Sequence, residues 1–140
     1  MRTRFWGTVL ACCVAAGGAP DAATAKDRIL RCELRQDGYY GGTPPEVHIA
    51  YKPGESRMVV YDSFLHFLEA GPVWGRVDRD NDRRFIIRWK VDDMKTDSGH
   101  TMDWRMKLSW DKKTGRATIT GKAAVSDDDN NGSGKCFFKK

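Results

Sequence analysis

The chain has 140 residues, of which 31% are charged and 40% hydrophobic, and its formal net charge is +5. This length suffices for one domain with a single hydrophobic core. The charge excess is too small to indicate a nucleic-acid-binding protein, and no segment beyond the N-terminal region is apolar enough to form a transmembrane helix.

The N-terminal residues have the three parts of a secretory signal peptide. Arg2 and Arg4 precede an apolar run over residues 5–16, and the small-residue string Ala-Thr-Ala follows at 23–25. A basic start, an apolar centre and an A-x-A site in this order are typical of a leader that is removed on export. The apolar run is shorter than the roughly 20 residues that a membrane-spanning helix needs. We therefore expect a signal peptide over residues 1–25.

Removal of this leader would leave one domain over residues 26–140, in the periplasm or secreted. That domain has 115 residues, which is 140 less the 25 of the leader. A second reading takes Val-Leu-Ala-Cys at 9–12 as a lipobox, in which Cys12 is acylated and tethers the chain to a membrane.

Two cysteines remain after the leader, Cys32 near the start of the domain and Cys136 near its end. An even number of cysteines in an exported chain predicts a disulfide, because that compartment is oxidising. A metal site is the alternative, but neither cysteine has a CxxC partner or a nearby histidine. We expect a Cys32–Cys136 bridge that joins the first and last strands.

The first part of the domain predicts three short strands, over residues 29–34, 47–51 and 57–61, because apolar and polar residues alternate there. Residues 62–70 differ, since Phe64, Leu65, Phe67 and Leu68 recur at helical spacing. Asp62 or Ser63 can cap a helix and Gly71-Pro72 can end it. A short helix covering one end of the sheet is expected, although the aromatic residues also suit a strand.

Five more strands are predicted after the helix, and Gly- and Pro-containing turns separate most of them. Asp111–Gly115 is typical of a hairpin loop with glycine in the left-handed conformation. About eight evenly spaced strands predict an all-β fold, a small antiparallel barrel or sandwich. These strands are expected at 73–77, 84–91, 102–110, 116–120 and 135–138.

If strands 84–91 and 102–110 are hairpin neighbours, their polar sides form one basic face that could hold an anionic ligand. An ordinary solvated strand face is the alternative. Trp89, Trp104 and Trp110 lie on the apolar side and are expected in the core. Trp74 lies between Gly-Pro and Gly75, where its ring could lie at a barrel rim and stack on a ligand, or close the core. The basic face comprises Arg84, Arg88, Lys90, Arg105 and Lys107.

Two acidic segments resemble the start of a calcium loop, because oxygen-bearing side chains alternate in them. Both lack the closing glutamate, so only weak calcium binding is expected, and solvated turns are the alternative. The better candidate has Asp127, Asp129 and Asn131, followed by Gly132. The other has Asp78, Asp80 and Asp82.

Support for enzymatic chemistry in the sequence is thin. His48, His66 and His100 fall in no metal or triad motif. Asp97, Ser98 and His100 share one polar loop, but neighbouring loop residues rarely reach triad geometry. A hydrolase would depend on His100 or His66.

Scattered segments of the chain resemble small exported bacterial proteins of unknown function. The resemblance covers about two thirds of the domain and implies an exported single domain, without assigning any functional residue. The segments are Val60–Leu65, Gly71–Val73, Asp80–Arg84, Ile87–Trp89, Thr114–Thr118 and Gly134–Cys136.

A cysteine near each end of an exported β-domain is also similar to periplasmic lysozyme inhibitors of barrel type, although their inhibitory loop motif has no counterpart here. From the sequence we expect a non-enzymatic module without a cofactor that binds an anionic cell-envelope component or a protein partner. The alternative is an inhibitor of a cell-wall hydrolase that acts through the loop at 92–101.

Overall fold

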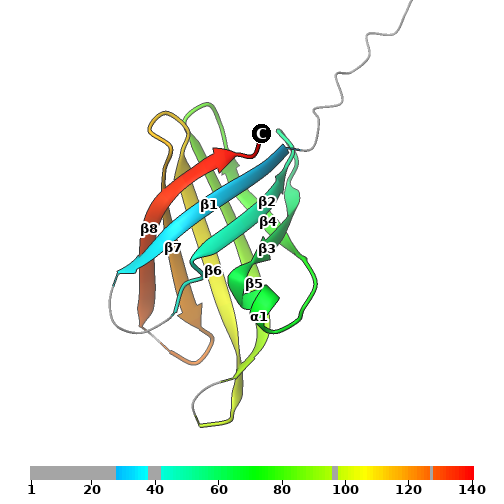
Figure 1. The fold of residues 1–140 in the computed structure, drawn as a ribbon, viewed down its shortest axis with the longest axis vertical. Coiled ribbons are helices and arrows are strands. Elements are labelled where there is room, and N and C mark those ends of the chain that lie inside the picture. The colour runs from blue at the N-terminus through cyan, green and yellow to red at the C-terminus, as the bar shows by residue number, and fades with distance from the viewer. Residues whose placement is uncertain (1–27, 38–41, 96–97, 127) are drawn as a thin grey trace, which may run out of the picture.

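The computed structural model describes residues 28–37, 42–95, 98–126 and 128–140. Within these ranges eight antiparallel strands form a closed barrel (Figure 1), in which each strand pairs with the next and β8 pairs back with β1. The prediction of an all-β fold is confirmed, and the choice between barrel and sandwich is settled as a barrel. The predicted signal peptide and Cys12 lie outside the described residues. None of the helices in the described part of the chain has the length and apolarity of a membrane span.

The elements follow one another along the chain as a meander with one helical insertion between β3 and β4. They are β1 Arg28–Asp37, β2 Glu46–Tyr51, β3 Arg57–Asp62, α1 Ser63–Phe67, β4 Val73–Asp80, β5 Arg84–Lys95, β6 Thr101–Asp111, β7 Arg116–Ala123 and β8 Asp129–Phe138.

The core lies inside the barrel, because alternate residues of each strand point inward and those residues are apolar. An eight-stranded barrel has an interior just wide enough for side chains to fill. Trp89 and Trp110 are buried and Trp104 packs partly buried against the core, as predicted for all three. Fully buried members include Leu30, Val47, Ile49, Val60, Phe85, Ile87, Leu108 and Ile119.

The disulfide joins Cys32 of β1 to Cys136 of β8, as predicted. The two residues lie directly opposite each other where the first and last strands pair. Both are buried, because each belongs to the inward-pointing side of its strand. The bridge therefore links the strands at which the barrel closes.

Helix α1 confirms the prediction of a short helix after β3. Asp62 is its N-cap and accepts a hydrogen bond of 2.8 Å from the Leu65 backbone N–H. The other carboxylate oxygen of Asp62 accepts a 2.7 Å hydrogen bond from the indole N–H of Trp89. Leu65 is buried against the core, so the helix covers this part of the barrel.

The main difference from the predicted strands concerns β8, which begins at Asp129 and not at residue 135. Asn131 and Gly132, expected in a turn, lie within this strand. A Cβ atom at Gly134 would lie 1.9 Å from the Glu33 carbonyl oxygen, and one at Gly132 would lie 2.9 Å from that of Arg35. The glycines let β8 approach β1 closely. Gly115, by contrast, has φ 78° in the predicted hairpin loop.

Candidate functional site

The predicted basic face lies on the outside of the barrel, over the hairpin formed by β5 and β6. Arg88 is opposite Lys107, and Lys90 is opposite Arg105. Arg84 lies at the end of the same face, opposite Asp111. All five side chains occupy the outward positions of strands whose inward positions are buried.

This face contains a groove of about 710 Å³ that extends onto the neighbouring strands. The groove adds Arg76 and Trp74 of β4 and Lys122 of β7 to the predicted residues. Sequence reasoning missed Arg76 and Lys122, because it assigned only the β5–β6 pair as neighbours. Six basic side chains and one acidic side chain line the groove: Arg76, Arg88, Lys90, Arg105, Lys107 and Lys122, with Asp129.

On one side of the groove, acidic side chains partly neutralise these cations. Asp78 forms ion pairs with Arg88 and Arg76, the latter at 3.3 Å between Nε and Oδ1. Partial burial opposes ionisation of Asp78, but the two guanidinium groups together lower its pKa. Lys90 Nζ lies 3.1 Å from Asp92 and 3.5 Å from Asp103, and the hydrogen bond to Asp92 is the main cause of its raised pKa.

Arg105, Lys107 and Lys122 form no ion pair with any residue in the described ranges. Arg105 and Lys122 lie on adjacent strands as direct register partners, and Lys107 lies next to them. Like charges held side by side repel one another unless an anion is bound between them. The groove is therefore electrostatically suited to an anionic ligand.

The Trp74 side chain lies on the outer wall of the barrel, whereas the sequence suggested a position at the barrel rim. Gly75 occupies an inward-facing position of β4, since an added Cβ atom there would lie 2.7 Å from Ile87 Cδ1. The side chain of the adjacent Trp74 therefore points outward. Its side chain is 60% exposed. The guanidinium carbon of Arg57 lies 4.8 Å from the centre of the indole ring, which is cation–π distance. Trp74 is thus an exposed aromatic wall of the basic groove.

The acidic segments do not form a calcium loop among the described residues. Asp129 and Asn131 lie in extended conformation on β8, and Asn131 accepts a hydrogen bond of 3.2 Å from Thr120; Asp127 lies outside the described ranges. Across those ranges, no three His, Cys, Asp or Glu side chains cluster so as to hold a metal ion. Weak calcium binding at Asp127, Asp129 and Asn131 stays a prediction.

The first acidic segment is divided between different partners. Asp78 pairs with the arginines of the groove, whereas Asp80 accepts hydrogen bonds from Tyr51 Oη at 2.9 Å and from Lys112 Nζ at 2.6 Å. Burial opposes the charge of Lys112, but its contacts with Asp80 and Tyr51 together outweigh this effect and raise the pKa of Lys112. Asp80 therefore stabilises the end of the barrel and is not placed as a ligand beside Asp78.

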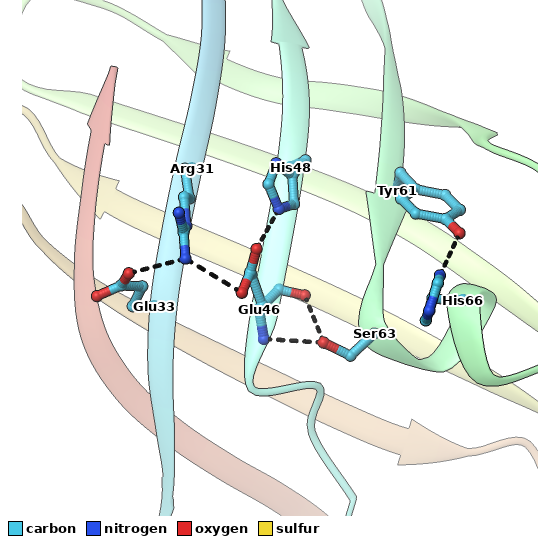
Figure 2. A network of polar contacts seen from close by, with 7 residues as sticks. All are labelled: Arg31, Glu33, Glu46, His48, Tyr61, Ser63 and His66. Carbon is cyan, nitrogen blue, oxygen red and sulfur yellow. Dashed lines mark hydrogen bonds and ion pairs between the residues drawn. The ribbon is translucent and has the colours of Figure 1, made fainter. Parts of the chain in front are cut away.

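A second, smaller hollow of about 270 Å³ lies over β2, β3 and α1, and sequence reasoning did not predict it. Figure 2 shows His48 and Tyr61 on adjacent strands, with His66 of α1 beside the Tyr61 hydroxyl. Tyr61 Oη and His66 Nδ1 are hydrogen-bonded at 2.9 Å. The ring of His48 is hydrogen-bonded to the carboxylate of Glu46, and this contact is the main cause of the lowered pKa of Glu46.

Ser63 is not paired with either histidine of this hollow. The Ser63 hydroxyl donates to the Glu46 carbonyl oxygen and accepts from the Glu46 backbone N–H, both at 3.2 Å. Neither imidazole activates Ser63, although nucleophilic catalysis would require such a contact. Of the other candidate triad, Ser98 and His100 lie between β5 and β6, and Asp97 lies outside the described residues.

Comparison with known proteins gives one partial similarity. Over 81 residues the chain is 26% identical to the Tol-Pal system protein TolB of Jannaschia sp. (strain CCS1), which covers 58% of this chain. The chain spans about a fifth of the length of that protein, since the aligned part is 18% of it. No protein-family model matches the chain, and no solved structure matches it.

Proposed function

We propose that the domain is a non-enzymatic binding module that holds an anionic component of the bacterial cell envelope in its basic groove. The observation that carries this proposal is the convergence of six cations and one exposed tryptophan on a single hollow of the outer barrel wall. A concentration of like charge in a concave surface attracts anions from solution, because the hollow focuses the electric field.

The proposal places the domain in the periplasm or outside the cell. The buried Cys32–Cys136 bridge is compatible with an oxidising compartment. The basic and apolar N-terminal residues favour export, as does the resemblance to small exported bacterial proteins. The partial similarity to a Tol-Pal system protein carries over neither an activity nor a partner, because it covers 18% of that protein.

Co-sedimentation of the oxidised domain with anionic lipid vesicles and with purified cell-wall sacculi tests this proposal. Binding to at least one of them is expected at low salt and is expected to weaken at high salt, because exposed charges are screened. Arg105→Glu combined with Lys107→Glu should abolish pelleting, since neither side chain has an ion-pair partner in the described ranges to offset its loss.

The matched control is Lys139→Glu combined with Lys140→Glu, which changes the net charge equally at two exposed positions outside the groove. The control should pellet like the parent protein. Equal loss in both variants would show that only overall charge matters. Absence of pelleting with either material at low salt would contradict the proposal.

Inhibition of a cell-wall hydrolase is a second candidate, favoured by the length of the β5–β6 hairpin. This hairpin extends beyond the other strands at the end of the barrel near α1 (Figure 1). It contains Asp93 at φ 59°, within a bulge between Val91 and Met94. A lysozyme activity assay distinguishes the candidates: an inhibitor should lose potency when Met94 and its partner Met102 are replaced by Ser, whereas the groove variants should retain it.

A further inference from the structure

The basic groove does not end at Lys107, because two further hollows continue it across the outer wall. The next hollow, of about 390 Å³, shares Lys107 and Thr120 with the groove. A third, of about 620 Å³, shares Arg84, Ser109 and Thr118 with the second. The three hollows form one continuous depression, which we call the track.

The strand register explains why the track is hollow. Ser109, Thr118 and Ser133 are direct register partners on β6, β7 and β8, and they form a row of short side chains. Longer side chains flank this row on both sides: Lys107 on one, Arg116 and Lys135 on the other. A row of small hydroxyl groups between long cationic side chains gives a depression with a hydrogen-bonding floor.

Cations continue to the far end of the track. Arg79 and Arg84 line the second hollow, and Arg84 donates a 2.9 Å hydrogen bond to Ser109. Arg116 and Lys135 line the third, with no ion-pair partner in the described part of the chain. The one acidic residue there is Asp111, whose carboxylate accepts the backbone N–H groups of Thr114 and Lys113, and these bonds lower its pKa.

The length of the track exceeds what a single anionic group would occupy. It runs from Trp74 on β4 to Lys135 on β8, across four strand-to-strand steps. Adjacent strands lie about 4.8 Å apart, so these steps cover roughly 19 Å along the curved wall. One headgroup would fill one hollow and leave the remaining cations without an anion. A chain that carries repeated negative charges would match all three.

We infer that the track binds a linear polysaccharide that carries a carboxylate on its repeating units, an inference that rests on the proposed function and specifies its ligand. The cations pair with the carboxylates of successive units. The hydroxyl floor of Ser109, Thr118 and Thr120 is complementary to sugar hydroxyl groups, and the exposed indole of Trp74 offers an apolar surface for a sugar ring. Phosphate polymers could use the charges and accept hydrogen bonds from the floor, but they would leave the indole without a partner.

Binding of galacturonic acid, a short oligogalacturonate and a long oligogalacturonate to the oxidised domain tests this inference, by calorimetry at two salt concentrations that are the same for all three ligands. Affinity per molecule should rise at least about tenfold from the short to the long oligomer, because each further contact forms at a high effective concentration. The long oligomer should also show the steeper salt dependence. Equal affinity for short and long oligomers would overturn the inference.

Arg116→Glu combined with Lys135→Glu separates the far end of the track from the groove. This variant should weaken binding of the long oligomer by about tenfold or more and leave the short oligomer unaffected. The control is again Lys139→Glu combined with Lys140→Glu, which carries the same charge change outside the track. If the far-end variant binds the long oligomer as tightly as the control, the track is not one site.

Trp74→Ala tests whether the ligand is a sugar chain. The substitution should weaken the long oligogalacturonate severalfold and leave inorganic polyphosphate of similar charge unchanged. Parent protein that binds polyphosphate or single-stranded DNA as tightly as the oligomer would overturn the polysaccharide assignment. Vesicles or sacculi that still pellet the domain while no oligomer binds would overturn this inference alone. Failure of all of these ligands would overturn the proposed function as well.

Discussion

Trp89, in the wall of the barrel, donates its indole N–H to the carboxylate of Asp62, the residue that caps helix α1. Asp62 is 1% exposed, and its burial raises its pKa. The two contacts of this carboxylate, one with the wall and one with the helix, hold α1 on the barrel. Because β3 and α1 also carry Tyr61, Ser63 and His66, the same carboxylate positions the smaller hollow.

Asp62→Ala should destabilise the domain substantially. It removes an N-cap, which costs roughly 1 kcal/mol, and leaves the buried Trp89 N–H without an acceptor, which costs about 1–3 kcal/mol more. Urea unfolding measures the change in the free energy of unfolding. Asp82→Ala is the control, since Asp82 is exposed, and it should stay within about 0.5 kcal/mol of the parent. Similar losses in both variants would contradict the role assigned to Asp62.

Reduction of the Cys32–Cys136 bridge should lower the melting temperature strongly. The bridge links residues 104 positions apart, and loss of a native disulfide from a small exported domain costs about 2–5 kcal/mol. Thermal unfolding with and without reductant measures the effect. The variant with Cys32→Ser and Cys136→Ser should melt like the reduced parent and should not respond to reductant. A melting curve of the parent that reductant does not shift would contradict this prediction.

Gly134→Ala should disrupt the closure of the barrel. Its Cβ atom would lie 1.9 Å from the Glu33 carbonyl oxygen, which belongs to the backbone of β1 and cannot rotate away. Overpacking of this kind costs about 1–3 kcal/mol or more. Gly71→Ala is the matched control, because no heavy atom lies within 4 Å of the added Cβ position. Equal unfolding free energies for the two variants, measured in urea, would contradict the close approach of β8 to β1.

The sequence predicted the parts of the fold that depend on local pattern. Strict alternation around Ile87 and Leu108 located β5 and β6, and the helical spacing after Asp62 located α1. It failed at the start of β8, where Asn131-Gly132 was expected in a turn, because the glycines there are required by contact with a strand about a hundred residues away. Tertiary packing overrides local propensity at such positions.

The candidate sites were predictable only where a hairpin joins their residues. Arg88 and Lys107 belong to one hairpin, so their shared face could be read from alternation. Arg76 and Lys122 join that face through pairing with β4 and β7, which required the full strand order. Glu46 and His48 are outward residues of one strand, but nothing in the sequence placed them beside Tyr61.

Glu46 should make stability depend on pH in the acidic range. Its hydrogen bond with His48, together with the charge of Arg31 at 3.4 Å, lowers its pKa below the unfolded value of about 4.3. A carboxyl group whose pKa is lowered by folding contributes stability above its unfolded pKa, and this contribution is lost as the pH falls through the folded pKa. The side chain is 39% exposed, so the contribution is within about 1 kcal/mol.

Glu46→Gln isolates this contribution, because it keeps the size of the side chain and removes its charge. Near neutral pH the variant should unfold at slightly lower urea concentration than the parent. As the pH falls from the unfolded pKa through the lower folded pKa, the two should converge, because the parent carboxylate becomes protonated. The control is Glu55→Gln, at an exposed position whose backbone N–H donates to the Lys52 carbonyl oxygen. Removal of the Glu55 charge should leave the difference from the parent the same at every pH. A constant difference between Glu46→Gln and the parent across this range would show that Glu46 acts through packing, and not through its charge.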